Sequence, residues 1–316
     1  MDPVGSRPVS TLSILILAIL LDALIGDPDW LWKRLPHPVT LIGKVIGGAD
    51  KAMNAGSATA RKIKGAALMV TLIAWAIALG IGIEFIPYAG PVLSVILAAI
   101  LIAQRSLAEH VFAVAEGLRT DITTGRRMVA RIVGRDTAAL NESDVSRAAI
   151  ESAAENFSDG VVAPVFWFMV AGLPGILVYK VVNTADSMIA HKTPKHKDFG
   201  LVAAWTDTIL NFVPARLTAL ALLAAGLAFD QRHMVLDDAP RHRSWNAGWP
   251  EAAMAGVLGV ALSGPRSYNG RVTDQPFINA KGRKELTPDD IDAAVMLLWR
   301  AWAGIIFILC VCAILT

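Results

Sequence analysis

Long apolar blocks are the feature of this sequence that most limits its fold. Residues 65 to 86 read GAALMVTLIAWAIALGIGIEFI, which is long enough to cross the hydrocarbon core of a bilayer as a helix. Because a spanning segment must satisfy its own backbone hydrogen bonds, the blocks predict helices. We expect an all-α, polytopic integral membrane protein with about five membrane elements. The other blocks cover residues 9–25, 92–103, 161–182, 209–229 and the C-terminal stretch to Leu315.

Composition supports a membrane protein. The 316 residues are 54% hydrophobic and only 18% charged, whereas ordinary soluble domains are about a quarter charged. The net charge of +2 and the lack of interleaved aromatic and basic residues argue against a nucleic-acid partner. The length would allow two domains, but the apolar blocks favour one membrane-embedded domain over residues 1–316. Within it we expect a polar helical segment at about 104–160 and a polar loop at about 230–292, with polar helical segments carrying the site.

Two of the blocks have special junctions. Residues 161–182 are interrupted by Pro164 and by the sequence GLPG from Gly172, which predicts a re-entrant hairpin or a discontinuous helix. Residues 92–103 run without a break into QRSLAEHVFAVAEGLR, which predicts a helix that leaves the membrane. After it, a helix is expected to begin near residue 141, capped by Ser143 or Asp144.

The distribution of basic residues predicts the orientation. Seven Lys and Arg residues lie between Lys33 and Lys64, so the positive-inside rule places this loop in the cytoplasm and the N-terminus outside. Residues 104–160 are then cytoplasmic, while the side of residues 230–292 is left open. We expect a multi-pass protein of the cell (inner) membrane whose site faces the cytoplasm.

The segment ESAAENFSDG, which begins at Glu151, carries the densest group of acids. Helical spacing places Arg147, Glu151 and Glu155 on one face, with Asp159 near its edge. Like charges four residues apart destabilise a bare helix by roughly 0.2–0.5 kcal/mol per pair, so partner cations or a bound metal must offset them. Carboxylate oxygens suit Mg²⁺. The alternative is a solvated face paired with basic residues.

A second group lies in YKVVNTADSMIAHKTPKHKDFG, which begins at Tyr179. Lys180, Asn183 and Ser187 share one helix face, Asp186 lies beside them, and Lys192 follows in a basic loop. Amide, carboxylate and ammonium groups at the end of an apolar element could hold a phosphate and its metal. The basic loop could instead lie against anionic lipid head groups.

A third group lies in WTDTILNFVPARLTAL, where Asp207 and Asn211 share a helix face and Arg216 follows. An arginine in an apolar stretch is costly unless it is paired or reaches the interface. It could form a structural ion pair with an acid or receive an anionic substrate bidentately.

Further candidates lie in loops. His37 is held between two prolines and beside Asp27, so it could serve acid–base or phosphate-binding work, although a loop histidine is more often a hydrogen-bonding residue. The sequence GPRSYNGRVTDQPFIN could line a site through Arg266 and Arg271. Phosphate-loop, dinucleotide-binding, serine-elbow and H-E-x-x-H motifs do not occur in the sequence. A hard cation on carboxylates is therefore favoured over zinc.

Four long stretches resemble one known family. They are LDALIGDPDWLWKRLPHPVTLIGKVI, ARIVGRDTAALNESDVSRAAIESAAENFSDGVVAPVFWF, KVVNTADSMIAHKTPKHKDFG and DTILNFVPARLTAL. Together they resemble the adenosylcobinamide-phosphate synthases of cobalamin biosynthesis, in the family's order from about residue 12 to the C-terminus, including SGPRSYNGR. The segment AHKTPKHKDFG is unusually rich in histidine and lysine for this family, which leaves the roles of His191 and His196 open.

The resemblance implies a membrane ligase of the late corrinoid pathway. It would join adenosylcobyric acid to (R)-1-aminopropan-2-ol phosphate, or to aminopropanol itself, through an amide bond. ATP would be consumed with Mg²⁺, and the product would be adenosylcobinamide phosphate. The lipid bilayer and other corrinoid-pathway enzymes are its expected partners. A membrane transporter or a non-catalytic scaffold of the same pathway is the alternative.

The chemistry assigns roles to the candidates, because a carboxylate must be activated, for example as an acyl phosphate, before an amine can attack it. The expected catalytic residues are Glu151, Glu155, Asp159, Asp186 and His37, of which Glu151, Glu155 and Asp186 are also the expected Mg²⁺ ligands. The expected substrate- and phosphate-binding residues are Arg147, Lys180, Asn183, Ser187, Lys192, Asp207, Asn211 and Arg216.

Overall fold

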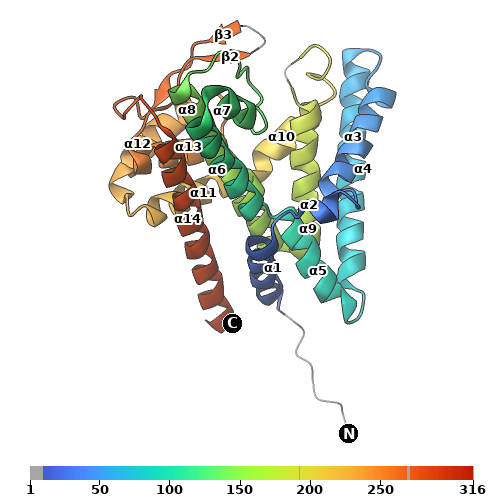
Figure 1. The fold of residues 1–316 in the computed structure, drawn as a ribbon. Helices are drawn as coiled ribbons and strands as arrows, with labels where there is room; N and C mark the ends of the chain where they lie inside the picture. Colours follow the sequence, from blue (N-terminus) through green and yellow to red (C-terminus); the bar gives the residue numbers. More distant parts are fainter. Residues whose placement is uncertain (1–9, 192, 269–270, 316) are drawn as a thin grey trace. The chain divides into compact units, whose positions relative to one another are not determined.

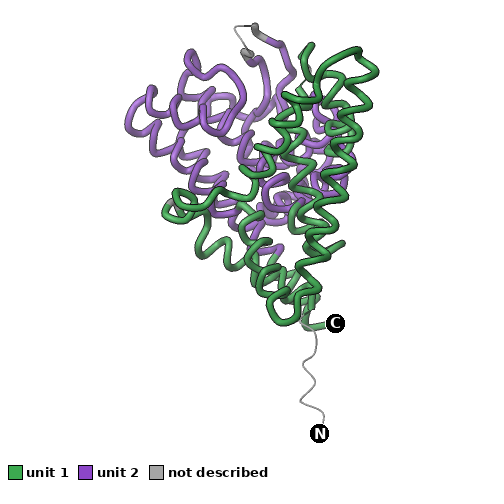
Figure 2. The backbone as a smooth tube through the Cα atoms, turned by 90° about the vertical axis from the view of Figure 1, so that its right-hand side faces the viewer, with its two compact units in different colours: residues 1–103, 164–207, 306–316 green, residues 104–163, 208–305 purple. Residues whose placement is uncertain are grey.

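The computed structural model describes residues 10–191, 193–268 and 271–315. This part of the chain is almost entirely helical, with four very short strands (Figure 1). It divides into two compact units (Figure 2). Unit 1 comprises residues 1–103, 164–207 and 306–316, and unit 2 comprises residues 104–163 and 208–305. The expectation of one membrane-embedded enzyme domain stays a prediction.

Unit 1 consists of helices from three stretches of the chain. The final turns of α14 (Pro288–Leu315) also belong to it. Within the unit, α5 contacts α1, α3 and α4. Besides the end of α14, the helices of unit 1 are α1 (Thr11–Ile25), α2 (Asp29–Trp32), α3 (Pro38–Met53), α4 (Ala58–Glu84), α5 (Ala89–Leu101), most of α9 (Ala163–Ile189) and most of α10 (Leu201–Leu210).

Helix α9 is discontinuous, as the glycine–proline sequence predicts. Ala171 and Gly172 have non-helical backbone angles, and Gly172 has φ +60. The backbone N–H of Leu173 donates to Oε1 of Glu84 at 2.8 Å, so the last residue of α4 satisfies a donor that the break leaves open. A Cβ on Gly172 would lie 2.5 Å from that same oxygen. The break therefore needs glycine for both its backbone angles and its space.

The basic loop after α9 is fastened to α3 and α4. Lys195 Nζ lies 2.6 Å from Oδ2 of Asp50, and His196 Nε2 lies 3.4 Å from the same oxygen. Arg61 donates to Asp198 at 2.5 Å. Although burial opposes it, the hydrogen bonds from Lys195 and Asn54 lower the pKa of Asp50. Ion pairs thus hold the loop in place.

Unit 2 packs helices around α8, where α6, α7, η1 and α13 contact it. Two antiparallel strand pairs, β1 with β4 and β2 with β3, follow α13. Most of α14 also belongs here. The elements are α6 (Gln104–Thr120), α7 (Ile122–Val129), α8 (Glu142–Phe157), the π-helical turn η1 (Ser158–Val162), α11 (Phe212–Ala225), η2 (Phe229–Gln231), α12 (Arg232–Asp238), η3 (Ala239–Arg241), α13 (Gly248–Leu258), β1 (Leu262–Ser263), β2 (Arg266–Tyr268), β3 (Arg271–Thr273) and β4 (Phe277–Ile278).

Three details differ from the sequence-based expectations. The cap of α8 is Asn141, whose side chain accepts from the N–H of Asp144, because the Asn side chain reaches the third amide of the helix. Helix α5 does not run unbroken into α6, since Ile102 has extended backbone angles. Residues 230–292 are more structured than a polar loop, because they hold α12, α13 and the strands.

The number of membrane elements agrees with the prediction. Among the described residues, four helical segments are long and apolar enough to cross a membrane, or five if α10 and α11 form one span interrupted at Asn211. The four are Ala58–Glu84, Ala89–Thr120, Glu142–Ile189 and Pro288–Leu315, and Thr11–Ile25 is a shorter apolar helix. The protein is a polytopic, all-α membrane protein.

Candidate functional site

Glu151 lies at the centre of a buried ionic cluster in unit 2. Its side chain is 5% exposed, and its Oε2 lies 2.7 Å from Nη2 of Arg135 and 3.1 Å from Nη2 of Arg266. Oε1 accepts the backbone N–H of Ser263 at 2.6 Å. Two arginines and an amide therefore compensate the charge of a buried carboxylate, and removing one partner of such a pair is strongly destabilising. The contacts fasten the strand segment to α8.

A second buried acid, Glu251 of α13, lies on the other side of Arg266. Its Oε2 lies 3.6 Å from Nη2 of Arg266, and its Oε1 lies 3.6 Å from Nε2 of His242. Neither Oε2 of Glu251 nor Nε2 of His242 has a hydrogen-bond partner within the described part of the chain. Nε2 of His242 and Oε1 of Glu251 are close enough to exchange a proton after a small shift.

Burial sets the charge state of this pair. Desolvation, and then the negative charge of Glu151, raise the pKa of the Glu251 carboxyl well above its usual value. Desolvation, with smaller contributions from Arg266 and Arg243, lowers the pKa of His242 to about 4. Burial therefore favours the neutral form of both side chains.

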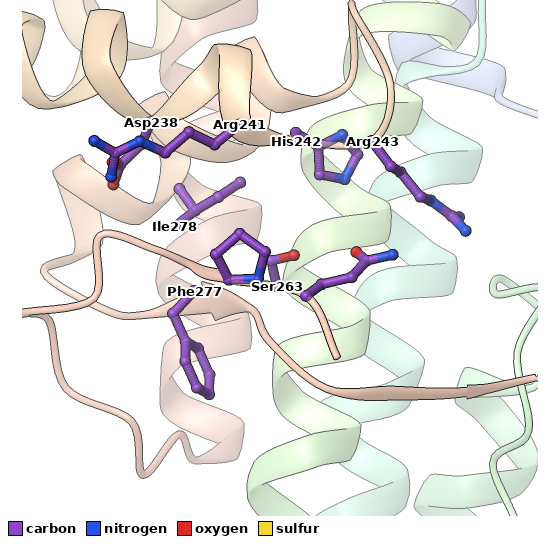
Figure 3. Close-up of a pocket in the computed structure, with 9 residues that line it drawn as sticks. Asp238, Arg241, His242, Arg243, Ser263, Phe277 and Ile278 are labelled. Carbon is purple, nitrogen blue, oxygen red and sulfur yellow. The ribbon is translucent and has the colours of Figure 1, made fainter. Parts of the chain in front are cut away.

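A small cavity, lined by charged, polar and apolar side chains, adjoins this pair in unit 2. Its volume is about 100 Å³, which corresponds to the volume of about three or four liquid water molecules. Figure 3 shows His242 between Arg241 and Arg243, with Ser263 facing it. The lining residues are Asp238, Arg241, His242, Arg243, Ser263, Gln275, Pro276, Phe277 and Ile278.

Ser263 joins the cavity wall to the ionic cluster. Its backbone has φ +62, in the left-handed region, which costs a non-glycine residue about 1–3 kcal/mol. Two hydrogen bonds hold Ser263 in this conformation: its backbone N–H donates to Glu151, and its Oγ accepts from Arg266 at 3.2 Å. Such strain, maintained by several contacts, is typical of functional sites.

Arg147 of α8 also contacts the segment that holds the short strands. It donates to the carbonyl oxygens of Ala261 and Lys284 and to the carboxylate of Asp144, and its guanidinium lies 5.6 Å from the centre of the Phe277 ring. These contacts fasten the β segment to α8. The structure thus gives Arg147 a structural contact set; its predicted role in substrate binding stays a prediction.

Arg216 is arranged differently. Its guanidinium lies 3.7 Å from the ring centre of Phe212 and 4.6 Å from that of Trp249, and Nη1 donates to the Phe212 carbonyl and to Asn246. Within the described residues it has no acidic partner. The structural ion pair, one of the two alternatives for Arg216, is therefore not formed there. Two aromatic rings orient the guanidinium, whose Nε and Nη2 edge has the geometry for bidentate anion binding.

The candidates of unit 1 form a second polar group. Asn183 Nδ2 donates to Oδ1 of Asp207 at 3.3 Å, which brings α9 and α10 together. Ser187 donates to the carbonyl of Asn183. Asp186 and Lys180 are partly exposed on the same helix. Asn183 and Asp207 therefore meet, while the predicted roles of these residues stay a prediction. Asp186 belongs to a different unit from Glu151 and Glu155.

The remaining candidates lie on several elements of the two units. Glu155 is exposed one turn after Glu151, and Asp159 is partly exposed in the π-helical turn η1. Asn211 is buried at the start of α11. His37 caps α3, accepting the N–H of Val39, and its Nε2 lies 3.6 Å from Asp27. Lys192 lies outside the described residues.

The donors form no dedicated metal cage. No group of three or more His, Cys, Asp or Glu in the described residues is arranged to hold a metal ion. Mg²⁺ commonly binds one or two carboxylates and takes its other ligands from phosphates and water. The partly exposed carboxylate of Asp186 fits that pattern.

Sequence reasoning missed three members of the buried cluster: Arg135, His242 and Glu251. They lie in segments of unremarkable composition, and only the fold brings them to Glu151 and Arg266. The one available signal was Glu251 at the start of an apolar stretch, where a carboxyl needs a partner.

Comparison with known proteins assigns the family. Residues 15–298 match the family described as CobD/Cbib protein. The chain is 49% identical over 302 residues to the cobalamin biosynthesis protein CobD of Sinorhizobium fredii, covering 91% of this chain and 92% of that protein. It is 50% identical over 302 residues to that of Brucella suis, with the same coverage, and 42% identical to that of Rhodobacter capsulatus, covering 96% of this chain and 98% of that protein. No solved structure matches the fold. The chain therefore belongs to the CobD/CbiB family of cobalamin biosynthesis proteins.

Proposed function

We propose that this protein is an adenosylcobinamide-phosphate synthase, which joins adenosylcobyric acid to (R)-1-aminopropan-2-ol phosphate, or to aminopropanol, with consumption of ATP. The observation that supports an enzyme over a transporter or a scaffold is the cavity of unit 2. It is lined by Arg241, His242 and Arg243 and rests on a buried acid–histidine pair. The cavity is far too small for a corrinoid, so it fits a small polar group.

The proposed reaction needs an activated carboxylate. Transfer of the terminal phosphoryl group of ATP to the carboxylate oxygen breaks the bond to the β-phosphate and gives an acyl phosphate and ADP. Attack by the amine then forms the C–N bond and releases phosphate, with the amine proton passing to a base or to water. Binding and charge stabilisation are the protein's main tasks in such a transfer.

Several side chains suit those tasks. The stacked guanidinium of Arg216 would bind a carboxylate or phosphate through its Nε and Nη2 edge. In unit 1, Lys180 would bind a phosphate, while Asn183 and Ser187 would orient it. Asp186 is the proposed ligand of Mg²⁺, which would neutralise phosphate charge. Glu155 and Asp159 stay candidates for the general base.

The test is a reaction with purified protein in detergent. Protein, ATP, Mg²⁺ and adenosylcobyric acid are incubated with aminopropanol or its phosphate, and the products are identified by mass. We expect an amide product with one amine. Labelled corrinoid entering vesicles without product would indicate a transporter, and activity only after adding other pathway enzymes would indicate a scaffold.

Two variants test the assigned residues. Arg216→Lys keeps the positive charge but loses the planar guanidinium that stacks on the two rings. We therefore expect KM for an anionic substrate to rise at least about tenfold. Asp186→Asn should lower kcat and raise the Mg²⁺ concentration needed for half-maximal rate. Wild-type kinetics in either variant would remove that residue from the mechanism. Exposed Arg232→Gln on α12 is the control for loss of an arginine.

A further inference from the structure

The cavity of unit 2 has the chemistry of an anion site. Three consecutive residues, Arg241, His242 and Arg243, line one side, and the hydroxyl of Ser263 and the amide of Gln275 add donors (Figure 3). The carboxylate of Asp238 lies 3.1 Å from Arg241 and accepts the N–H of Asn279 at 2.7 Å, so Asp238 and Arg241 compensate each other and Arg243 gives the lining a net positive charge. The lining therefore favours a negatively charged ligand.

His242 has an arrangement suited to gaining a proton. Its side chain is 3% exposed. Its Nδ1 lies 3.1 Å from the N–H and 3.3 Å from the carbonyl of Ser244, and its Nε2 faces Oε1 of Glu251 without a hydrogen bond. A protonated His242 would donate to both the Ser244 carbonyl and an ionised Glu251. The site thus has acceptors for an imidazolium before any ligand is bound.

We propose that this cavity binds the phosphate group of a phosphate monoester and that its binding moves a proton from the Glu251 carboxyl to His242. In the starting tautomer Nδ1–H of His242 donates to the Ser244 carbonyl, which leaves Nε2 unprotonated. The O–H bond of Glu251 then breaks and the Nε2–H bond of His242 forms, so no proton is exchanged with solvent. The new imidazolium then faces the phosphate, with the positive charge of Arg243 beside it.

Charges on every neighbouring element bear on this transfer. Besides desolvation, Arg266 of β2 and Arg243 of the cavity loop oppose a positive His242, while Glu151 of α8 favours it. Besides desolvation, Glu151 and Glu155 of α8 hold the proton on Glu251, while Arg266 and Arg135 oppose them. Without an anion the balance leaves His242 neutral. A doubly charged phosphate beside it supplies the missing negative charge.

The proposal deepens the proposed function, because it assigns this cavity to the phosphate of the amine partner. Binding of (R)-1-aminopropan-2-ol phosphate to the full-length protein in detergent is measured by calorimetry. Inorganic phosphate, aminopropanol, a non-hydrolysable ATP analogue and short-chain phosphatidic acid are the other arms. We expect the amino-alcohol phosphate to bind and aminopropanol not to bind. Binding by the ATP analogue or the lipid alone would overturn the assignment.

Variants locate the site. Arg243 is exposed, so Arg243→Gln should fold normally and bind the monoester at least about tenfold more weakly, which is the loss expected for a hydrogen bond to a charged group. His242→Asn should weaken binding similarly. Exposed His233→Asn on α12 is the matched control and should bind as the wild type. Wild-type affinity in both Arg243→Gln and His242→Asn would refute the site.

The proton shift has its own spectroscopic readout. Infrared difference spectra on adding the monoester should show the loss of a protonated carboxyl band. The Glu251→Gln variant should not show this loss. An unchanged band on binding would refute the shift. Binding with these signatures but no amide product from any amine would refute the proposed function and leave this site standing. If both Arg243→Gln and His242→Asn form the amide with a wild-type KM for the amine, the proposed function stands and the site is refuted.

Discussion

At the scale of single residues, Glu151 shows how a site-like sequence pattern can serve stability. The stripe of acids on α8 led to the prediction of a metal ligand, whereas the structure surrounds Glu151 with Arg135, Arg266 and the N–H of Ser263. A helix face defines which residues share a direction, but other segments decide what lies opposite. The arginines that compensate the negative charge of Glu151 lie more than ten residues away in the sequence.

Glu151→Gln is therefore expected to reduce stability. It removes the charge that compensates two buried arginines, and removing one partner of a buried pair costs about 3–5 kcal/mol. We expect a clearly lower midpoint in thermal unfolding of the purified protein. Glu142→Gln, at the exposed start of the same helix, should cost only about 0.3–1 kcal/mol through the helix dipole. Equal midpoints for the two variants would show that the buried cluster contributes nothing.

At the scale of elements, the broken helix α9 was predicted well. Gly172 and Pro174 are local signals, and a local backbone preference survives whatever surrounds it. The junction between α5 and α6 was not predicted. Ile102 carries no breaker signal in its sequence, so the extended backbone there depends on its tertiary surroundings.

Gly172→Ala should destabilise the α9 break. Alanine disfavours the observed φ of +60, and its Cβ would meet the Glu84 carboxylate at 2.5 Å, so a loss of at least about 1 kcal/mol is expected. Gly82→Ala lies in regular α4 with open space around it, and should be neutral or slightly stabilising. Thermal unfolding of both variants in detergent measures the difference. An unchanged midpoint in Gly172→Ala would mean that the break tolerates a side chain.

At the scale of the whole molecule, the apolar blocks predicted the class of protein and the number of membrane elements. They did not predict the content of residues 230–292, which carry the wall of the cavity. Short helices and two-residue strands leave almost no periodicity to read. The candidate cavity therefore came from the structure alone.

Orientation can be tested with single cysteines in a chain from which Cys310 and Cys312 have been removed. Basic residues between Lys33 and Lys64 place Ala55→Cys in the cytoplasm, and Tyr88→Cys, at the turn before α5, outside. We expect an impermeant maleimide to label Tyr88→Cys in intact spheroplasts, and Ala55→Cys only after permeabilisation. The opposite labelling pattern would invert the proposed topology.

The sequence by itself determined an all-α membrane protein, its broken helix and its family, because these depend on hydropathy, glycine and proline, and long ordered motifs, all of which are local along the chain. Only the tertiary structure decided which charges meet. Glu151 meets Arg135 and Arg266, and Glu251 meets His242 beside a cavity. The physical reason is that a buried charge is stabilised by whichever opposite charge the fold brings within a few ångströms, and sequence distance does not report that approach.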